Sequence, residues 1–197
     1  MWKSIGRLLL KLHGWKTDEN VPKEALYCVM TAAPHTTNWD FYFMRVAFMV
    51  LGIPVKIAIK DVWTKVPLLG SFIKYIGGLG INRGPKDPSK PRKSYVEQMA
   101  DFFKEYDKIA IGISPEGTRS LTTKWKLGFW HTAKKAGVPI TFGYLDYKRK
   151  VAGVSSTVLY PSDNLEADLK IMMDFYKTVT PKYPEKFALD ERATGRN

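Results

Sequence analysis

The sequence predicts an α/β fold with a mostly parallel central sheet flanked by helices, and three observations lead to this prediction. The 197 residues suffice for one domain with a sizeable core. Hydrophobic residues make up 45% of them, as in globular proteins. Short apolar runs alternate with segments of helical periodicity. Strands separated by helices usually pair in parallel, because each helix returns the chain across the sheet.

Six apolar runs are predicted strands, and six periodic segments are predicted helices. The strands are expected at 25–33, 54–59, 79–82, 109–114, 138–145 and 151–160. The helices are expected at 2–13, 38–51, 62–76, 91–107, 126–136 and 164–179. Gly52 and Gly137 follow two of these helices, where glycine commonly ends a helix.

The C-terminal part carries a capping signal and then a polar tail. Asp163 is placed to cap the helix at 164–179, and Glu166 would complete a capping box. Residues 144–154 are expected to form a hairpin. The tail after Pro181 is polar, so we expect it to be loosely held.

The first predicted helix is amphipathic. Its apolar residues recur at helical spacing, with basic residues between them: Trp2, Ile5, Leu8, Leu9 and Leu12, with Lys3, Arg7 and Lys11. Such a helix either lies in a membrane interface or packs on the protein with a charged outer face. The apolar run is too short for a signal peptide, and no segment has the roughly 18 apolar residues of a membrane span.

The net charge indicates the kind of partner, and the cysteine and histidine content argues against a disulfide or a metal site. The formal net charge of +12 favours an anionic partner: nucleic acid, an acidic membrane surface, or a phosphate-bearing substrate or carrier. The single cysteine, Cys28, excludes an internal disulfide and lies in an apolar run, so we expect a buried thiol. Three histidines and one cysteine show no metal-ligand spacing, so no metal is expected.

Three polar clusters follow predicted strands. HTTNWD (35–40) follows the strand at 25–33, NRG (82–84) ends the strand at 79–82, and PEGTRS (115–120) follows the strand at 109–114. Ligands gather at the carboxyl ends of parallel strands, so these clusters predict one site.

Each cluster alone also has an ordinary structural interpretation. His35 and Asp40 suit a general base with its orienting carboxylate, but a capped helix beside a histidine fits as well. Gly117 allows a sharp turn and close approach to a ligand, while Arg83 and Arg119 suit a phosphate or carboxylate. Glu116 is placed either to hold Arg119 or to accept a substrate hydroxyl.

Taken together, the motifs resemble the glycerolipid acyltransferase family, whose best-known members are the lysophosphatidic acid acyltransferases. The motifs are His-x-x-x-x-Asp at 35–40, Gly-x-Asn-Arg at 80–83, Pro-Glu-Gly-Thr-Arg-Ser at 115–120 and Val-Pro-Ile at 138–140. Lys126 and Gly128 match the Lys-x-Gly of the family. The resemblance spans about residues 25 to 145, with one departure, because Asn82 stands where aromatic or acidic residues are common.

The resemblance implies transfer of a fatty acyl group from a thioester to the hydroxyl of a lysophospholipid-like acceptor. His35 would be the general base, oriented by Asp40. The acceptor would contact Arg83, Glu116, Gly117, Thr118 and Arg119. Acyl-CoA or acyl carrier protein would be the co-substrate, with no cofactor. The acceptor stays open, with a lyso-aminolipid, a sugar lipid or glycerol 3-phosphate as alternatives.

The residues suit acyl transfer on chemical grounds as well, independently of the family resemblance. Histidine suits removal of a hydroxyl proton near neutral pH, because its ordinary pKa is about 6.5. GISPE (112–116) lacks the final glycine of a Gly-x-Ser-x-Gly elbow, so no protein nucleophile is expected.

A lipid substrate favours the membrane interpretation of the first helix. We expect an amphipathic membrane-interface helix at 1–16, a single α/β domain at 17–197, and a peripheral cytoplasmic location at the inner face of the cell membrane. The expected partners are an anionic membrane surface, the thioester donor and the lysolipid acceptor. No nucleic acid is expected, because the basic residues are scattered and no recognition motif occurs. A non-catalytic basic protein that binds membranes or nucleic acid is the alternative.

Overall fold

The computed structural model describes residues 2–82 and 93–194, and it confirms the predicted α/β fold. The strands are β1 (Lys16–Thr17), β2 (Tyr27–Ala32), β3 (Val55–Lys60), β4 (Gly78–Ile81), β5 (Ile109–Ile113), β6 (Ile140–Asp146) and β7 (Val151–Leu159). The helices are α1 (Trp2–Leu12), α2 (Asn38–Leu51), α3 (Asp61–Thr64), α4 (Leu69–Tyr75), α5 (Tyr95–Phe102), α6 (Gly128–Ala136), α7 (Leu165–Tyr176) and α8 (Glu191–Thr194). Two short 3-10 turns lie at Lys23–Leu26 and Pro184–Lys186.

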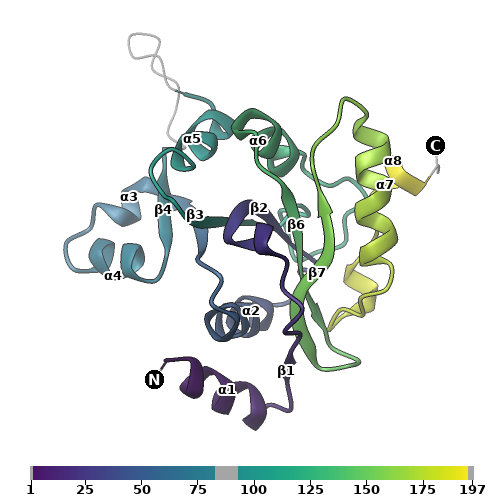
Figure 1. Ribbon diagram of the computed structural model, residues 1–197, viewed down its shortest axis with the longest axis horizontal. Coiled ribbons are helices and arrows are strands. Elements are labelled where there is room, and N and C mark those ends of the chain that lie inside the picture. Colours follow the sequence, from purple (N-terminus) through teal and green to yellow (C-terminus); the bar gives the residue numbers. More distant parts are fainter. Residues whose placement is uncertain (1, 83–92, 195–197) are drawn as a thin grey trace.

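The described strands form one sheet in the order β1-β7-β6-β2-β5-β3-β4 (Figure 1). Neighbouring strands run parallel, except that β6 and β7 are antiparallel and form the hairpin expected at 144–154. The strand β2 is central, between β5 and β6, and places the start of the HTTNWD segment at the carboxyl edge of the sheet.

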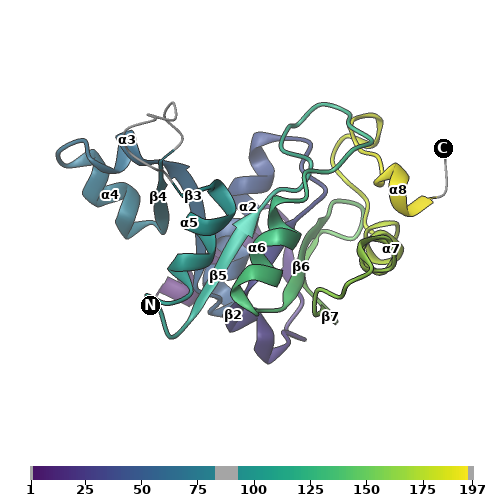
Figure 2. The same ribbon diagram turned by 90° about the horizontal axis from the view of Figure 1, so that it is seen from above.

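Helices cover both faces of the sheet (Figures 1 and 2). Because side chains alternate along a strand, Cys28 and Met30 of β2 pack on the α2 side, whereas Val29 joins the core beneath α5, α6 and α7. The expected burial of Cys28 is confirmed. Beyond α2, the helix α1 forms an outer layer through Leu10.

Local signals fix both ends of α2. The Thr37 side chain caps its first turn, and Asp40 completes a capping box by accepting the Thr37 backbone N–H. Gly52, with a φ of 77°, ends the helix in the left-handed conformation, and Gly137 does the same for α6 with a φ of 67°. Both glycine predictions are confirmed.

The helix expected at 62–76 is interrupted, so that prediction is wrong. Pro67 has no backbone N–H and disfavours helical geometry at Val66, so the chain breaks into α3 and α4. The helix α4 then folds back tightly against α3: a Cβ on Gly70 would lie 2.3 Å from the Thr64 carbonyl oxygen. Among the described residues, no helix has the length and apolar content needed to cross a bilayer.

The predicted capping box at the start of α7 is also wrong. Asn164 caps the helix by accepting the backbone N–H of Ala167. Asp163 instead pairs with Lys134 of α6 at 2.8 Å. Adjacent Asp and Asn are both good caps, and only the position of Lys134 in the fold separates them.

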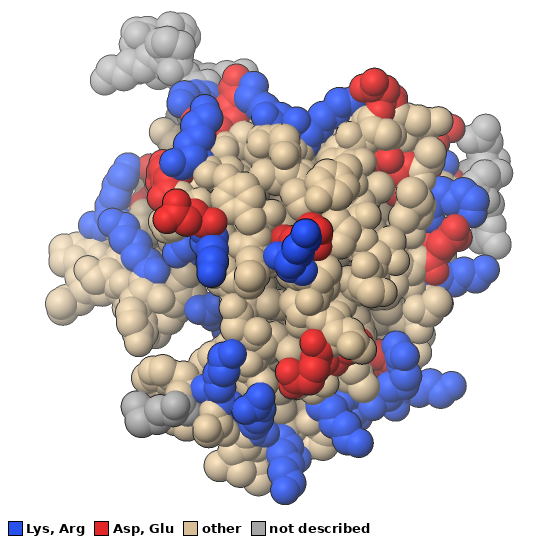
Figure 3. Space-filling model, in the orientation of Figure 1, with Lys and Arg blue, Asp and Glu red and all other residues tan. Residues whose placement is uncertain are grey.

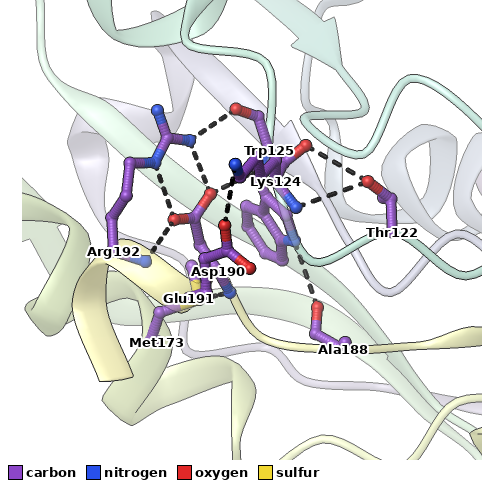
Figure 4. A network of polar contacts seen from close by, with 8 residues as sticks. All are labelled: Thr122, Lys124, Trp125, Met173, Ala188, Asp190, Glu191 and Arg192. Atoms are coloured by element: carbon purple, nitrogen blue, oxygen red, sulfur yellow. Dashed lines mark hydrogen bonds and ion pairs between the residues drawn. The ribbon is translucent and has the colours of Figure 1, made fainter. Parts of the chain in front are cut away.

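The C-terminal tail is held firmly, contrary to expectation (Figure 4). Asp190 is fully buried, accepts the Trp125 backbone N–H at 2.6 Å, and forms an ion pair with Arg192. Arg192 also donates to the Trp125 carbonyl, and the Trp125 indole donates to Ala188. The tail therefore anchors the segment that connects PEGTRS to α6.

Candidate active site

His35 and Asp40 lie together at the carboxyl edge of the sheet. His35 follows β2, Asp40 stands in the first turn of α2, and the intervening turn places His35 Nδ1 3.3 Å from Asp40 Oδ2. The Asp40 side chain is 3% exposed and the His35 side chain 28%, so the carboxylate is enclosed while the imidazole reaches solvent. The proximity of these two residues is the geometry that a general base and its orienting partner require.

Three further donors hold the Asp40 carboxylate. Its Oδ2 accepts the backbone N–H groups of Thr36 and Thr37 at 2.8 and 2.9 Å, and its Oδ1 accepts the Tyr147 hydroxyl at 2.6 Å. These bonds fix the carboxylate, which therefore orients the imidazole with Nδ1 inward. Nε2 is then the nitrogen that can take a proton from a substrate.

Sequence reasoning missed Tyr147, which lies in the turn between β6 and β7. It is 107 positions from Asp40, so no local pattern connects the two. Burial and the hydrogen bond to Asp40 raise the pKa of Tyr147, so its hydroxyl stays protonated and donates. The ring also packs edge-on against Trp15, with centroids 4.9 Å apart. The hairpin thus contributes an orienting group to the site.

Substituting Tyr147→Phe is expected to lower kcat about tenfold, because the Asp40 carboxylate loses one of the donors that position it. The lost hydrogen bond to a charged group should also cost about 1.5–3 kcal/mol of stability. The effect should fall on kcat rather than on KM, because Tyr147 is not among the residues that line either depression beside His35. Tyr42→Phe, which removes a hydroxyl from the same aromatic cluster, is the matched control. Equal kcat values for both variants would exclude this role for Tyr147.

Glu116 lies behind His35. Its carboxylate is buried, and its two oxygens accept the His35 backbone N–H at 3.0 and 3.1 Å. The Ser114 hydroxyl donates to the same carboxylate at 3.2 Å. Burial raises the pKa of Glu116 to about 7, against the opposing effect of the bond from His35. The side chain expected to contact the acceptor therefore braces the turn that carries His35.

The stability of the protein should reflect this raised pKa. The ordinary pKa of a glutamate is 4.5, and that of Glu116 in the folded protein is about 7. Between these two pH values the folded state keeps a proton on Glu116 that the unfolded state has released. This group's contribution to the free energy of unfolding therefore falls by about 3 kcal/mol as pH rises through that window.

The substitution Glu116→Gln removes this titration. The free energy of unfolding of the variant, measured with urea and compared with that of the wild type, should rise by about 3 kcal/mol between pH 5 and pH 8. Glu185→Gln, at an exposed carboxylate, is the control and should show no such gain. A constant difference between Glu116→Gln and wild type across this range would contradict the assignment.

The remaining predicted acceptor residues lie on the turn after β5. Gly117 has a φ of 63°, a backbone conformation that favours glycine, and the flexible end of the Lys126 side chain lies against it. Thr118 and Arg119 are exposed, and the Arg119 guanidinium donates to the Asn38 side chain at the start of α2. Arg83 lies outside the described residues.

Two depressions meet at His35. One is largely apolar and runs between α2 and β3; its lining includes Pro34, Asp40, Phe41, Met44, Phe48, Val55 and Ile57. The other is polar and lies over the turn after β5; its lining is Ser114, Gly117, Thr118, Arg119 and Ser120. His35 and Ser114 line both, so the imidazole stands where an apolar group and a polar group could meet.

This arrangement defines a class of protein: an α/β enzyme frame that presents a histidine–aspartate pair at the carboxyl edge of a parallel sheet. The chain belongs to the acyltransferase family, because the family model described as Acyltransferase matches residues 15–141, more than half of its length. The resemblance to glycerolipid acyltransferases is thereby confirmed.

Two known proteins give further comparisons. Lysophosphatidylcholine acyltransferase 1 of Danio rerio is 28% identical over 160 residues, which cover 80% of this chain and 28% of that protein. This chain thus spans little more than a quarter of that relative. The crystal structure of PlsC, the 1-acyl-sn-glycerophosphate (LPA) acyltransferase of Thermotoga maritima, superposes with a TM-score of 0.57 and 16% identity, over 88% of this chain and 74% of that one. The second comparison shows a shared fold.

Proposed function

We propose that this protein transfers a fatty acyl group from an acyl thioester to the hydroxyl of a lysophospholipid-like acceptor. The observation that carries the proposal is the position of His35, which is oriented by Asp40 and lines both an apolar and a polar depression. A lysolipid acyltransferase must bring a hydroxyl on a polar headgroup to the carbonyl of an apolar chain, and these two depressions offer the matching surfaces.

The reaction needs one base and no protein nucleophile. His35 Nε2 takes the proton of the acceptor hydroxyl as its oxygen attacks the thioester carbonyl. Asp40 stabilises the imidazolium that forms, as the aspartate does in serine hydrolases. The tetrahedral intermediate collapses, the carbon–sulfur bond breaks, and the imidazolium returns the proton to the thiolate. Acyl-CoA and acyl carrier protein both provide such a thioester.

The two depressions have separate proposed roles. The apolar one, lined by Met44, Phe48 and Ile57, would take the acyl chain. The polar one would take the acceptor headgroup, with Arg119 able to fork onto a phosphate. Lys126, whose ammonium lies against Gly117, adds positive charge at the same turn. Arg83 is proposed to contact the acceptor from the neighbouring loop.

The helix α1 is proposed to lie in the interface of an anionic membrane, at its inner face. Gly6 and Leu10 are its buried residues, and a Cβ on Gly6 would lie 2.7 Å from the Val50 side chain of α2. The helix therefore docks through Gly6 and Leu10 and leaves four other large apolar residues exposed: Trp2, Ile5, Leu8 and Leu12. Lysine and arginine beside this face would contact lipid headgroups.

The test is release of free thiol from a long-chain acyl-CoA, with and without lysophosphatidic acid. We expect release that depends on the acceptor, and formation of the diacyl product. Lysophosphatidylcholine and glycerol 3-phosphate, offered separately, define the headgroup, and acylated carrier protein replaces acyl-CoA to define the donor. Absence of acceptor-dependent release with every donor and acceptor would refute the proposal.

A further inference from the structure

The segment formed by α3, α4 and their connection, residues 61–75, exposes an unusual amount of apolar surface. It holds seven of the seventeen exposed large hydrophobic side chains of the described residues: Val62, Trp63, Val66, Leu68, Leu69, Phe72 and Tyr75. Leu68, at the tip between the helices, is 89% exposed. Clusters of this kind on a soluble surface mark interaction sites, because leaving them in water is unfavourable.

The local fold explains why this surface stays uncovered. Pro67 splits the segment into two short helices, and Gly70 allows them to pack backbone to backbone. Thr64 and Gly70 are the buried residues of α3 and α4, so the two helices meet through small side chains. The large side chains are consequently directed away from the contact.

The charges around this surface suit anionic lipid. Lys60, Lys65 and Lys74 against Asp61 give residues 60–75 a net charge of 3 − 1 = +2. Figure 3 shows the projection over α3 and α4 mostly free of charged residues, with basic side chains along its border. Exposed tryptophan and tyrosine beside lysine is the composition found at the headgroup level of membranes. A second copy of this chain would place like charges opposite one another.

The segment 61–75 lies directly after a strand that lines the apolar depression beside His35. The strand β3 supplies Val55 and Ile57 to the lining of that depression and continues directly into α3. In both ribbon views α3, α4 and the start of α1 lie on the same side of the molecule, away from α7 and α8 (Figures 1 and 2). An attachment through α3 and α4 would hold this end of β3 at the lipid surface.

We propose that α3 and α4 form a second membrane-docking element, which inserts Leu68 and the neighbouring aromatic residues into the headgroup region of an anionic bilayer. Together with α1 it gives the protein two points of attachment and hence a fixed orientation. The proposal shares its lipid partner with the proposed function but needs no catalytic residue.

The single buried cysteine makes a direct test feasible. Burial raises the pKa of the Cys28 thiol to about 12, so a cysteine introduced at the surface is labelled selectively. Leu68→Cys is labelled with a polarity-sensitive fluorophore and mixed with vesicles of equal parts phosphatidylglycerol and phosphatidylcholine. We expect a blue shift and quenching by lipids that carry a quencher near the headgroup. Tyr160→Cys, at an exposed tyrosine just after β7, is the control and should not respond.

Three outcomes decide the proposal. A response at Leu68→Cys with none at Tyr160→Cys supports it, even if acyl transfer fails in the thiol assay, so the two proposals fail separately. A response at Leu8→Cys in α1 with none at Leu68→Cys overturns it. A shift at Leu68→Cys that depends on protein concentration without vesicles also overturns it, because that result indicates self-association.

Sedimentation with the same vesicles gives a second measurement. The double substitution Trp63→Ser and Phe72→Ser should weaken binding about tenfold or more, since each aromatic side chain contributes apolar area. Tyr160→Ser with Ile171→Ser, at two exposed hydrophobic residues elsewhere, should bind as the wild type does. Equal binding by both double variants would overturn the proposal.

Discussion

Replacing His35 with alanine is expected to lower kcat for acyl transfer by about 10²- to 10⁴-fold, the contribution of a positioned general base. The ring lies with Nδ1 3.3 Å from a buried carboxylate, so its loss removes both the proton acceptor and the group that Asp40 orients. Binding of donor and acceptor should change little, because neither depression is formed by the imidazole alone. The measurement is single-turnover acyl transfer at saturating acyl-CoA.

The fold should tolerate this change. The His35 side chain is partly exposed, and its main structural contact, the backbone N–H bonded to Glu116, remains in the variant. His131→Ala, at an exposed histidine of α6, is the matched control and should retain full activity. Undiminished transfer by a folded His35→Ala variant would rule out the histidine-base mechanism.

Replacing Asp40 with asparagine should separate the charge of this residue from its structural contacts. The amide oxygen can still accept the backbone N–H groups of Thr36 and Thr37, and the amide nitrogen can donate to the Tyr147 oxygen. The fold is therefore kept. The neutral amide no longer stabilises the imidazolium, so kcat should fall by about 10²-fold or more with KM nearly unchanged.

Asp40→Ala is the informative comparison. It leaves the backbone N–H groups of Thr36, which is buried, and Thr37, which is partly buried, without their acceptor, and it removes the capping box. These losses should cost about 2–4 kcal/mol of stability. In Asp40→Ala, activity and thermal stability should thus fall together. In Asp40→Asn, activity should fall while thermal stability is kept. Asp40→Asn with wild-type kcat would show that the aspartate acts only as a helix cap.

Six strands of the sheet could be predicted because their signals are local, whereas β1, which is only Lys16–Thr17, has no apolar run and was not predicted. Apolar runs, helical periodicity and glycines after α2 and α6 each lie within a few residues of the structure they encode. His35 and Asp40 could be paired for the same reason, since five positions across a strand–helix junction leave little freedom. Family motifs added the turn at 115–120, which the sheet brings beside His35.

The features that could not be predicted from the sequence depend mostly on contacts between distant segments. Tyr147 reaches Asp40, and Glu116 reaches the His35 backbone, across 107 and 81 positions. Asp190 looked like one polar residue of a tail, yet it is buried because Trp125 and Arg192 supply its partners. The break at Pro67 was visible in the sequence, but the apolar periodicity continued through it and concealed the change of direction.

The central place of β2 has a consequence for biosynthesis. This strand pairs with β5 and β6, so it is synthesised before either of its sheet neighbours, the first of which begins at Ile109. Both of its edges then stay open, and an apolar strand with open edges invites intermolecular pairing. The Asp40 carboxylate acquires its last donor only when Tyr147 has been added. The histidine–aspartate pair is therefore synthesised 107 positions ahead of the hydroxyl that completes the hydrogen bonding of its carboxylate.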